Sequence, residues 1–243
     1  MTNDATEAKG TLFLSELARG AQLAFANAEQ LFREASLLRE SGAKNRALFL
    51  HQISMEECAK VDLLGAWATS LLMGTPVDIS KLARAMANHK TKNRVNAYML
   101  KPGDDEFNAR EQADWKGALD AFKAMQAAFH ERSNSAKNAS LYVDFVEGTF
   151  VTPNERITDD MVAEIAETNR IYLGLMHPKV HMLNRWETGS APVKNMLATF
   201  RQRMEELREQ HPDEPDRALA IVLEEMLASE LAKRPASVPE DST

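Results

Sequence analysis

The apolar residues of this chain recur mainly at intervals of three and four, the spacing that gathers them on one face of an α-helix. No segment longer than a few residues alternates apolar and polar positions as a half-buried strand does. The pattern therefore predicts an all-α protein. We expect long helices at about 11–40, 44–73, 78–100, 108–133 and 158–186, then shorter ones at about 192–209 and 216–233.

Residues that begin or end helices mark several of these boundaries. Gly42 follows the first helix and Gly74 the second, and glycine readily adopts the left-handed conformation that closes a helix. Asp78 or Ser80 is expected to cap the third helix and Thr158 the fifth, because their side-chain oxygens accept hydrogen bonds from the free N–H groups at a helix start.

The same pattern divides the chain into four parts. Residues 11–190 form the main helical domain and residues 191–232 a C-terminal helical extension, while the polar ends, 1–10 and 233–243, are expected to be disordered. Between the fourth and fifth helices lies "NSAKNASLYVDFVEGTFVTPNERI", an irregular stretch that is long for a connection. Connections of this length often carry function.

Composition narrows the class of protein and its compartment. The single cysteine, Cys58, excludes an intramolecular disulfide, and His177 and His181 stand one helical turn apart without an evident third metal ligand. The polar N-terminus does not resemble a signal peptide, and no run of about 18 apolar residues occurs. We therefore expect a soluble cytoplasmic protein with no membrane contact, no metal and no other cofactor.

The charges are unevenly distributed along the chain. The formal net charge is −7, yet residues 81–101 carry six Lys and Arg and no acidic residue, which leaves −13 for the rest. A concentrated cationic segment on an acidic protein suits a polyanion such as RNA, although a solvated helix face with acidic neighbours is the alternative. The six cations are Lys81, Arg84, Lys90, Lys92, Arg94 and Lys101.

Two carboxylates and an ammonium group interrupt the apolar run "HQISMEECAKVDLL" at 51–64. On a helical wheel Glu57 and Lys60 point inward, with Glu56 beside them. Because burying an unpaired charge is costly, we expect Lys60 to pair with Glu57 or Glu56. Such a pair either sets the register of the bundle or orients a group on a neighbouring helix.

These residues also carry a family resemblance. The segment "AFANAEQLFREASLLRESGAKNRALFLHQISMEECAK" resembles the AbiV family of abortive-infection proteins, "NHKTK" matches that family's His-x-x-Lys, and "LYVDF" matches its Tyr-Val-Asp segment. The resemblance covers about residues 19–185. It implies a HEPN-like bundle of four to five long helices, a homodimer, and a role in bacterial defence against phage.

HEPN domains often cleave RNA without a metal, using Arg and, after four to six residues, His. Arg84 and His89 stand at this spacing in "RAMANH" and are the candidate catalytic pair. His is suited to moving a proton from the ribose 2′-hydroxyl, and Arg to stabilising charge on the phosphate. A second placement of the motif is "KNASLY", where tyrosine, a poor base at neutral pH, occupies the histidine position.

Two functions remain open at this stage. The first is a ribonuclease that blocks translation or growth on infection, with Glu56, Glu57 and Lys60 supporting the catalytic pair. The second is a non-catalytic protein that binds a phage-encoded protein or a component of the translation machinery. In either case the expected RNA- or partner-contacting residues are Lys90, Lys92, Arg94, Lys137, Asn138, Tyr142 and Asp144.

Overall fold

The fold is taken from a computed structural model that describes residues 2–75, 77–97, 100, 102–212, 217, 218, 221, 222 and 225, with side chains from residue 13 onward. The predicted helix at 216–233 and the predicted tail at 233–243 lie almost wholly outside these residues. The described part is overwhelmingly helical, so the all-α prediction is confirmed.

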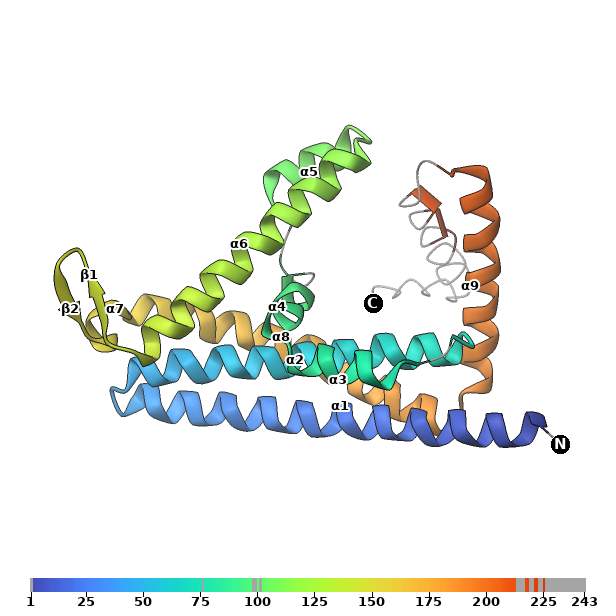
Figure 1. The fold of residues 1–243 in the computed structure, drawn as a ribbon, viewed down its shortest axis with the longest axis horizontal. Helices are drawn as coiled ribbons and strands as arrows, with labels where there is room; N and C mark the ends of the chain where they lie inside the picture. Colours follow the sequence, from blue (N-terminus) through green and yellow to red (C-terminus); the bar gives the residue numbers. More distant parts are fainter. Residues whose placement is uncertain are drawn as a thin grey trace, which may run out of the picture.

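Three long helices lie side by side and form the body of the molecule: α1 (Thr2–Glu40), α2 (Lys44–Leu72) and α8 (Asp159–Thr188) (Figure 1). Their ends at Glu40, Leu72 and Thr188 fall within two residues of the predicted ends, whereas α1 begins well before the predicted start at residue 11. Gly42, with φ +83°, adopts the left-handed conformation that turns α1 into α2.

Small side chains let α1 and α2 approach closely. The alanines of α1 that face the core are completely or almost completely buried, and a side-chain carbon added to Gly20 would lie 3.3 Å from a methyl carbon of Leu64. Helix separation follows from the side chains at the contact, so short ones bring the two axes together. The buried alanines of α1 are Ala18, Ala21, Ala24, Ala28 and Ala35.

The prediction of one helix over 78–100 is wrong, because this segment forms two helices: α3 (Ile79–Ala87) and α4 (His89–Ala97). Asn88 between them has an extended backbone, and its side-chain oxygen accepts a hydrogen bond from Thr91 N at 3.0 Å. Asparagine competes in this way with the helical hydrogen bonds of the main chain. His89 therefore stands at the beginning of a helix.

The predicted fourth helix is also two helices, α5 (Asp104–Glu111) and α6 (Trp115–Leu141). Ala113, with φ +55°, makes the turn, and Asp114 caps α6 by accepting a hydrogen bond from Gly117 N at 2.9 Å. Helix α6 continues eight residues beyond the predicted end at 133. It rises away from the body, with α5 packed along its outer half (Figure 1).

A small antiparallel hairpin, β1 (Asp144–Val146) and β2 (Thr149–Val151), follows α6 within the stretch predicted to be irregular. Glu147 and Gly148 both have positive φ, as the tightest hairpin turns require. The short helix α7 (Pro153–Arg156) then leads into α8, whose predicted cap is confirmed, since Thr158 Oγ1 accepts a hydrogen bond from Met161 N. Helix α9 (Ala191–Gln210) projects from the opposite end of the body (Figure 1).

A buried polar network ties the three long helices together. Ser54 Oγ of α2 lies 2.7 Å from Ala28 O of α1 and 3.1 Å from Asn169 Oδ1 of α8. Asn169 Nδ2 lies 3.2 Å from Nδ1 of the fully buried His51. Burial, helped by the positive charge of Arg39, lowers the pKa of His51 to about 4, so this imidazole is neutral in the folded chain at ordinary pH.

His51 should make folding pH-dependent. Between pH 6.5 and about 4 the unfolded chain protonates this histidine and the folded chain does not, so stability should fall as the pH decreases through this window. The loss attributable to His51 should reach about 3 kcal/mol at the acid end. Urea unfolding of wild type and His51→Gln at several pH values measures it, with the exposed His181→Gln as control. Equal pH slopes for wild type and His51→Gln would contradict this assignment.

Candidate functional site

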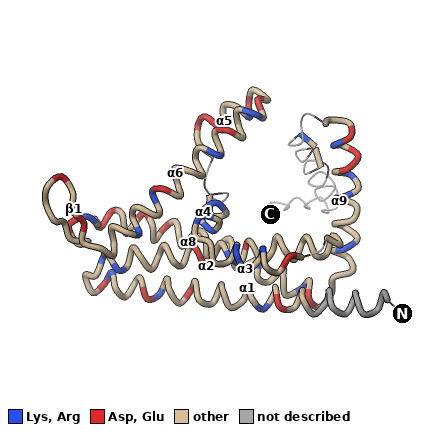
Figure 2. Tube along the Cα trace, in the orientation of Figure 1, with Lys and Arg blue, Asp and Glu red and all other residues tan. Residues whose placement is uncertain are grey.

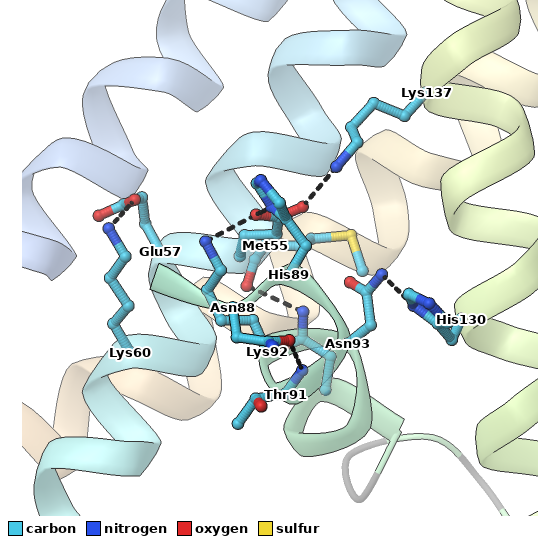
Figure 3. Close-up of polar contacts among 12 residues, drawn as sticks. Met55, Glu57, Lys60, Asn88, His89, Thr91, Lys92, Asn93, His130 and Lys137 are labelled. Carbon is cyan, nitrogen blue, oxygen red and sulfur yellow. Dashed lines mark hydrogen bonds and ion pairs between the residues drawn. The ribbon is translucent and has the colours of Figure 1, made fainter. Parts of the chain in front are cut away.

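The carboxylate of Glu56 is the centre of the candidate site. It lies on α2 where α4 and α6 cross that helix, and the residue is only 3% exposed. Lys92, His89 and Lys137 converge on this carboxylate from the two crossing helices (Figure 3). Oε2 lies 2.5 Å from His89 Nδ1 and 2.9 Å from Lys92 Nζ, and Oε1 lies 3.0 Å from Lys137 Nζ.

The charges of this cluster keep Glu56 ionised. Burial by itself raises the pKa of the Glu56 carboxyl, but the hydrogen bonds from Lys92, Lys137 and His89 together lower it below its ordinary value. The two ammonium groups are also withdrawn from water, with side chains 6% and 13% exposed. One carboxylate with two ammonium groups leaves a net charge of +1 before any charge on the imidazole is counted.

His89 combines a fixed orientation with access to solvent. Its side chain is 58% exposed, although Nδ1 is held by the buried carboxylate. An ionised carboxylate can only accept hydrogen bonds, so the Nδ1 atom carries the hydrogen and donates it to Glu56. In the neutral ring Nε2 is then the free acceptor, and an outside group can give it a proton.

Arg84, the predicted catalytic partner of His89, lies on α3, beyond the break at Asn88. Its side chain is exposed and makes no hydrogen bond or ion pair with the residues that the structure describes. No hydrogen bond of the described residues joins Arg84 to His89. Lys92 and Lys137 are instead the cations that share a carboxylate with His89.

Lys92 is one of the residues predicted to contact RNA or a partner, yet it is only 5% exposed and is bonded to Glu56. Lys90 and Arg94, one on each side of it in α4, remain exposed. Lys and Arg are concentrated over α3 and α4 (Figure 2). A cationic surface therefore exists beside His89, but Lys92 belongs to the interior.

Glu57 and Lys60 form the predicted ion pair, with 2.5 Å between Oε1 and Nζ. Their side chains are 12% and 23% exposed, so the pair sits at the edge of the interior and not within it. Figure 3 shows it beside the Glu56 cluster, and no bond joins the two groups among the contacts of the described residues. Glu56 is the deeply buried member of the Glu-Glu pair.

Only Lys137 of the "KNASLY" segment reaches the cluster. Asn138 is exposed, and Tyr142, at the end of α6, is 60% exposed. Asp144 begins the hairpin and forms an ion pair with Arg156 of α7. Tyr142 and Asp144 therefore belong to the hairpin surface, apart from His89.

Sequence reasoning missed the residues that hold α4 in place. Asn93 Nδ2 lies 3.1 Å from His130 Nδ1 of α6, and Asn96 Nδ2 donates to Met55 O of α2 at 3.0 Å. Tyr172 of α8 donates its hydroxyl hydrogen to Asn96 O at 2.8 Å. Two asparagines within one short basic helix, Asn93 and Asn96, were the available signal that a polar face of α4 points inward.

The described ranges contain neither a metal-binding cluster nor a membrane-spanning helix. No group of three or more His, Cys, Asp and Glu there is arranged to hold a metal ion, and His177 and His181 approach each other with Nε2 atoms 3.3 Å apart. Within the same ranges, no helix combines the length and apolar character needed to cross a bilayer.

The burial of Glu56 predicts an unequal response of the two neighbouring glutamates. Glu56→Gln leaves two buried ammonium groups without their carboxylate and should cost about 3–5 kcal/mol of unfolding free energy. Glu57→Gln breaks a pair at the edge of the interior and should cost about 1 kcal/mol. Denaturant unfolding of both variants and of Glu56→Gln/Lys92→Met, which should recover part of the loss, measures this order. A larger loss for Glu57→Gln would refute it.

Comparison with known proteins finds a family match that covers most of the helical body. The sequence model of the AbiV family, a HEPN family, matches residues 16–174, which is 159 of 243 residues. An uncharacterized protein of Sinorhizobium fredii, y4gJ, is 45% identical over 107 residues, 44% of this chain and 56% of that protein. The chain thus spans about half the length of this curated relative. No solved structure matches.

The matched range begins in α1, ends in α8, and includes every residue of the Glu56 cluster. His89 and Lys92 of α4 and the buried Glu56 of α2 therefore all fall within the range that the family model matches. This chain belongs to the AbiV family of HEPN proteins.

Proposed function

We propose that this AbiV-family chain acts in abortive infection against phage as a HEPN-type ribonuclease, with His89 as the general base. One observation carries the proposal: Nδ1 of an exposed imidazole is held 2.5 Å from a buried, ionised carboxylate. This arrangement fixes the tautomer and orientation of a histidine that accepts a proton, and leaves Nε2 for the substrate.

In the proposed reaction Nε2 of His89 takes the proton of a ribose 2′-hydroxyl. The 2′-oxygen forms a bond to the adjacent phosphorus, and the bond from phosphorus to the 5′-oxygen of the next nucleotide breaks. Water protonates the leaving 5′-oxygen, and the hydroxide so formed takes the proton held by His89, giving a 2′,3′-cyclic phosphate and a 5′-hydroxyl. The step requires no metal ion, and cleavage of cellular RNA would arrest translation or growth.

The net positive charge of the Glu56 cluster would stabilise negative charge on the phosphate in this reaction. Lys92 and Lys137 lie around the carboxylate that holds His89, so a phosphate at Nε2 would experience their field in a partly dry site. Lys90 and Arg94 are exposed on the same helix and suit contacts to flanking phosphates. Arg84, on α3, is proposed as a further phosphate contact. A homodimer would bring two such surfaces together.

His89→Ala should abolish RNA cleavage and any growth arrest on expression, with a nearly unchanged melting temperature, because an exposed ring contributes little to stability. Total cellular RNA is incubated with wild type, with and without EDTA, and the ends are tested for cyclic phosphate. Wild type should remain active with EDTA, and the exposed His181→Ala should behave as wild type. Cyclic ends at the wild-type rate from His89→Ala would refute the proposal.

RNA binding should survive in His89→Ala, since the phosphate contacts are elsewhere. Lys90→Ala/Arg94→Ala should bind RNA more weakly and with a flatter dependence on salt, by about one unit of slope for each lost contact. Fluorescence polarisation of a labelled RNA over a range of salt concentrations measures both. An unchanged slope would remove these two residues from the interface.

A second candidate function, recognition of a phage-encoded protein or a translation component, rests on the hairpin. Phe145 and Phe150 form a cross-strand pair with ring centroids 5.0 Å apart, and they are 64% and 78% exposed. Val143, two residues before Phe145, falls on the same face and is also exposed. Exposed aromatic residues grouped on one face commonly mark a protein-binding surface.

If the hairpin binds a partner, Phe145→Ser/Phe150→Ser should remove protection of infected cells while leaving the melting temperature and RNA cleavage in vitro unchanged. Plaque counts on cells expressing each variant measure protection. Phe107→Ser, on a 54% exposed residue of α5, is the matched control. Full protection by the hairpin variant would rule out this role.

A further inference from the structure

A cleft separate from the Glu56 cluster opens between α2, α6 and α8. It has a volume of about 600 Å³, within the range of small-molecule sites. Gln52 in its wall stands one helical turn before Glu56 on α2. The apolar part of the lining consists mainly of Leu48, Leu100, Phe129, Ala136, Met161 and Ile165. These side chains offer a flat aromatic or heterocyclic ring a surface that excludes water.

Gln52 is the unusual member of this lining. The residue is 9% exposed, and its side-chain amide makes no hydrogen bond with any residue that the structure describes. The amide opens on the cleft and has no protein partner there, so water or a ligand group must satisfy its donor and acceptor. The amide presents a donor and an acceptor side by side to the cleft. A ligand edge that carries a neighbouring acceptor and donor would satisfy both.

Besides Arg156, which is paired with Asp144, the rim supplies one charge of each sign. Arg132 of α6 is exposed, and its guanidinium has no partner among the described residues, so it is available to an anion such as a phosphate. Glu164 of α8 provides an acceptor for an amine.

We propose that this cleft binds an adenine base, with Gln52 pairing to the base edge and Arg132 contacting the attached phosphate. Glutamine matches the adjacent acceptor and donor of adenine in a bidentate pair. Phe129 provides a ring for stacking, which binds unpaired bases in many proteins. The Glu164 carboxylate favours a base that carries an exocyclic amine over one that carries a carbonyl there.

The adenine can belong to a free nucleotide or to an unpaired position of an RNA strand, and the test separates these sources. Isothermal titration with AMP examines the first. Fluorescence polarisation with labelled 2′-O-methyl hexaadenylate and hexauridylate examines the second. The methylated sugars cannot form a cyclic phosphate, so the result is independent of whether His89 cleaves RNA.

Gln52→Met removes the amide and nearly conserves the volume, so the chain should remain as stable as wild type. It should weaken binding of the adenine ligand about tenfold or more and remove the preference for adenylate over uridylate. Arg132→Gln, on an exposed residue, should weaken binding several-fold and reduce its salt dependence. Gln30→Met, on an exposed glutamine of α1, is the matched control and should bind as wild type.

Binding of AMP assigns the cleft to free nucleotides, and binding of the hexaadenylate alone assigns it to RNA. Either result supports the proposal if Gln52→Met weakens it. Two outcomes would overturn it: no adenine ligand binds wild type, or Gln52→Met and Arg132→Gln both bind as wild type does. Neither outcome bears on the cyclic-phosphate assay of the His89 variant, so the two proposals fail separately.

Discussion

A single buried carboxylate determines how the smaller helices are placed on the body of this protein. Burying the Glu56 carboxylate without partners would be strongly unfavourable. Its partners come from both α4 and α6. A buried ion pair of this kind adds little net stability compared with apolar packing, yet it is costly to break from one side. The cluster therefore acts mainly as a constraint on position, because other placements of α4 or α6 would leave a charge unpaired.

The break at Asn88 allows α4 to meet this constraint. Had α3 and α4 formed one straight helix, His89 and Lys92 would have continued along the direction of α3. The extended Asn88 redirects the chain so that both side chains reach Glu56, while Asn93 and Asn96 attach α4 to α6 and α2. As a result, the His89 imidazole is exposed while its Nδ1 is bonded to the buried Glu56 carboxylate. The cations of the site arrive from different elements, one from α4 and one from α6.

Much of the body could be predicted from the sequence, because its signals are local. The ends of α1 and α2, the Thr158 cap and the Glu57–Lys60 pair all depend on residues within one or two helical turns. Bonds between distant residues could not be predicted: Lys137 lies 81 positions from Glu56. Nor does a run of basic residues reveal that Lys92 is internal while Lys90 and Arg94 are not, since no apolar stripe marks the inward face of α4 and its asparagines are the one signal of it. Ala113 has a positive φ, which alanine rarely adopts, so this residue does not predict the boundary between α5 and α6.

The alanine-lined contact between α1 and α2 also limits how this chain can diverge during evolution. At Ala18, Ala21 and Ala28 there is no exposed surface to accommodate a longer side chain, and even one added carbon at Gly20 would crowd Leu64. Overpacked cores typically lose about 1–3 kcal/mol, a large share of the stability of an ordinary domain. Substitutions that accumulate in descendants of this sequence should therefore gather on the outer faces of the long helices and on the exposed hairpin, where a change of side chain disturbs no neighbouring helix.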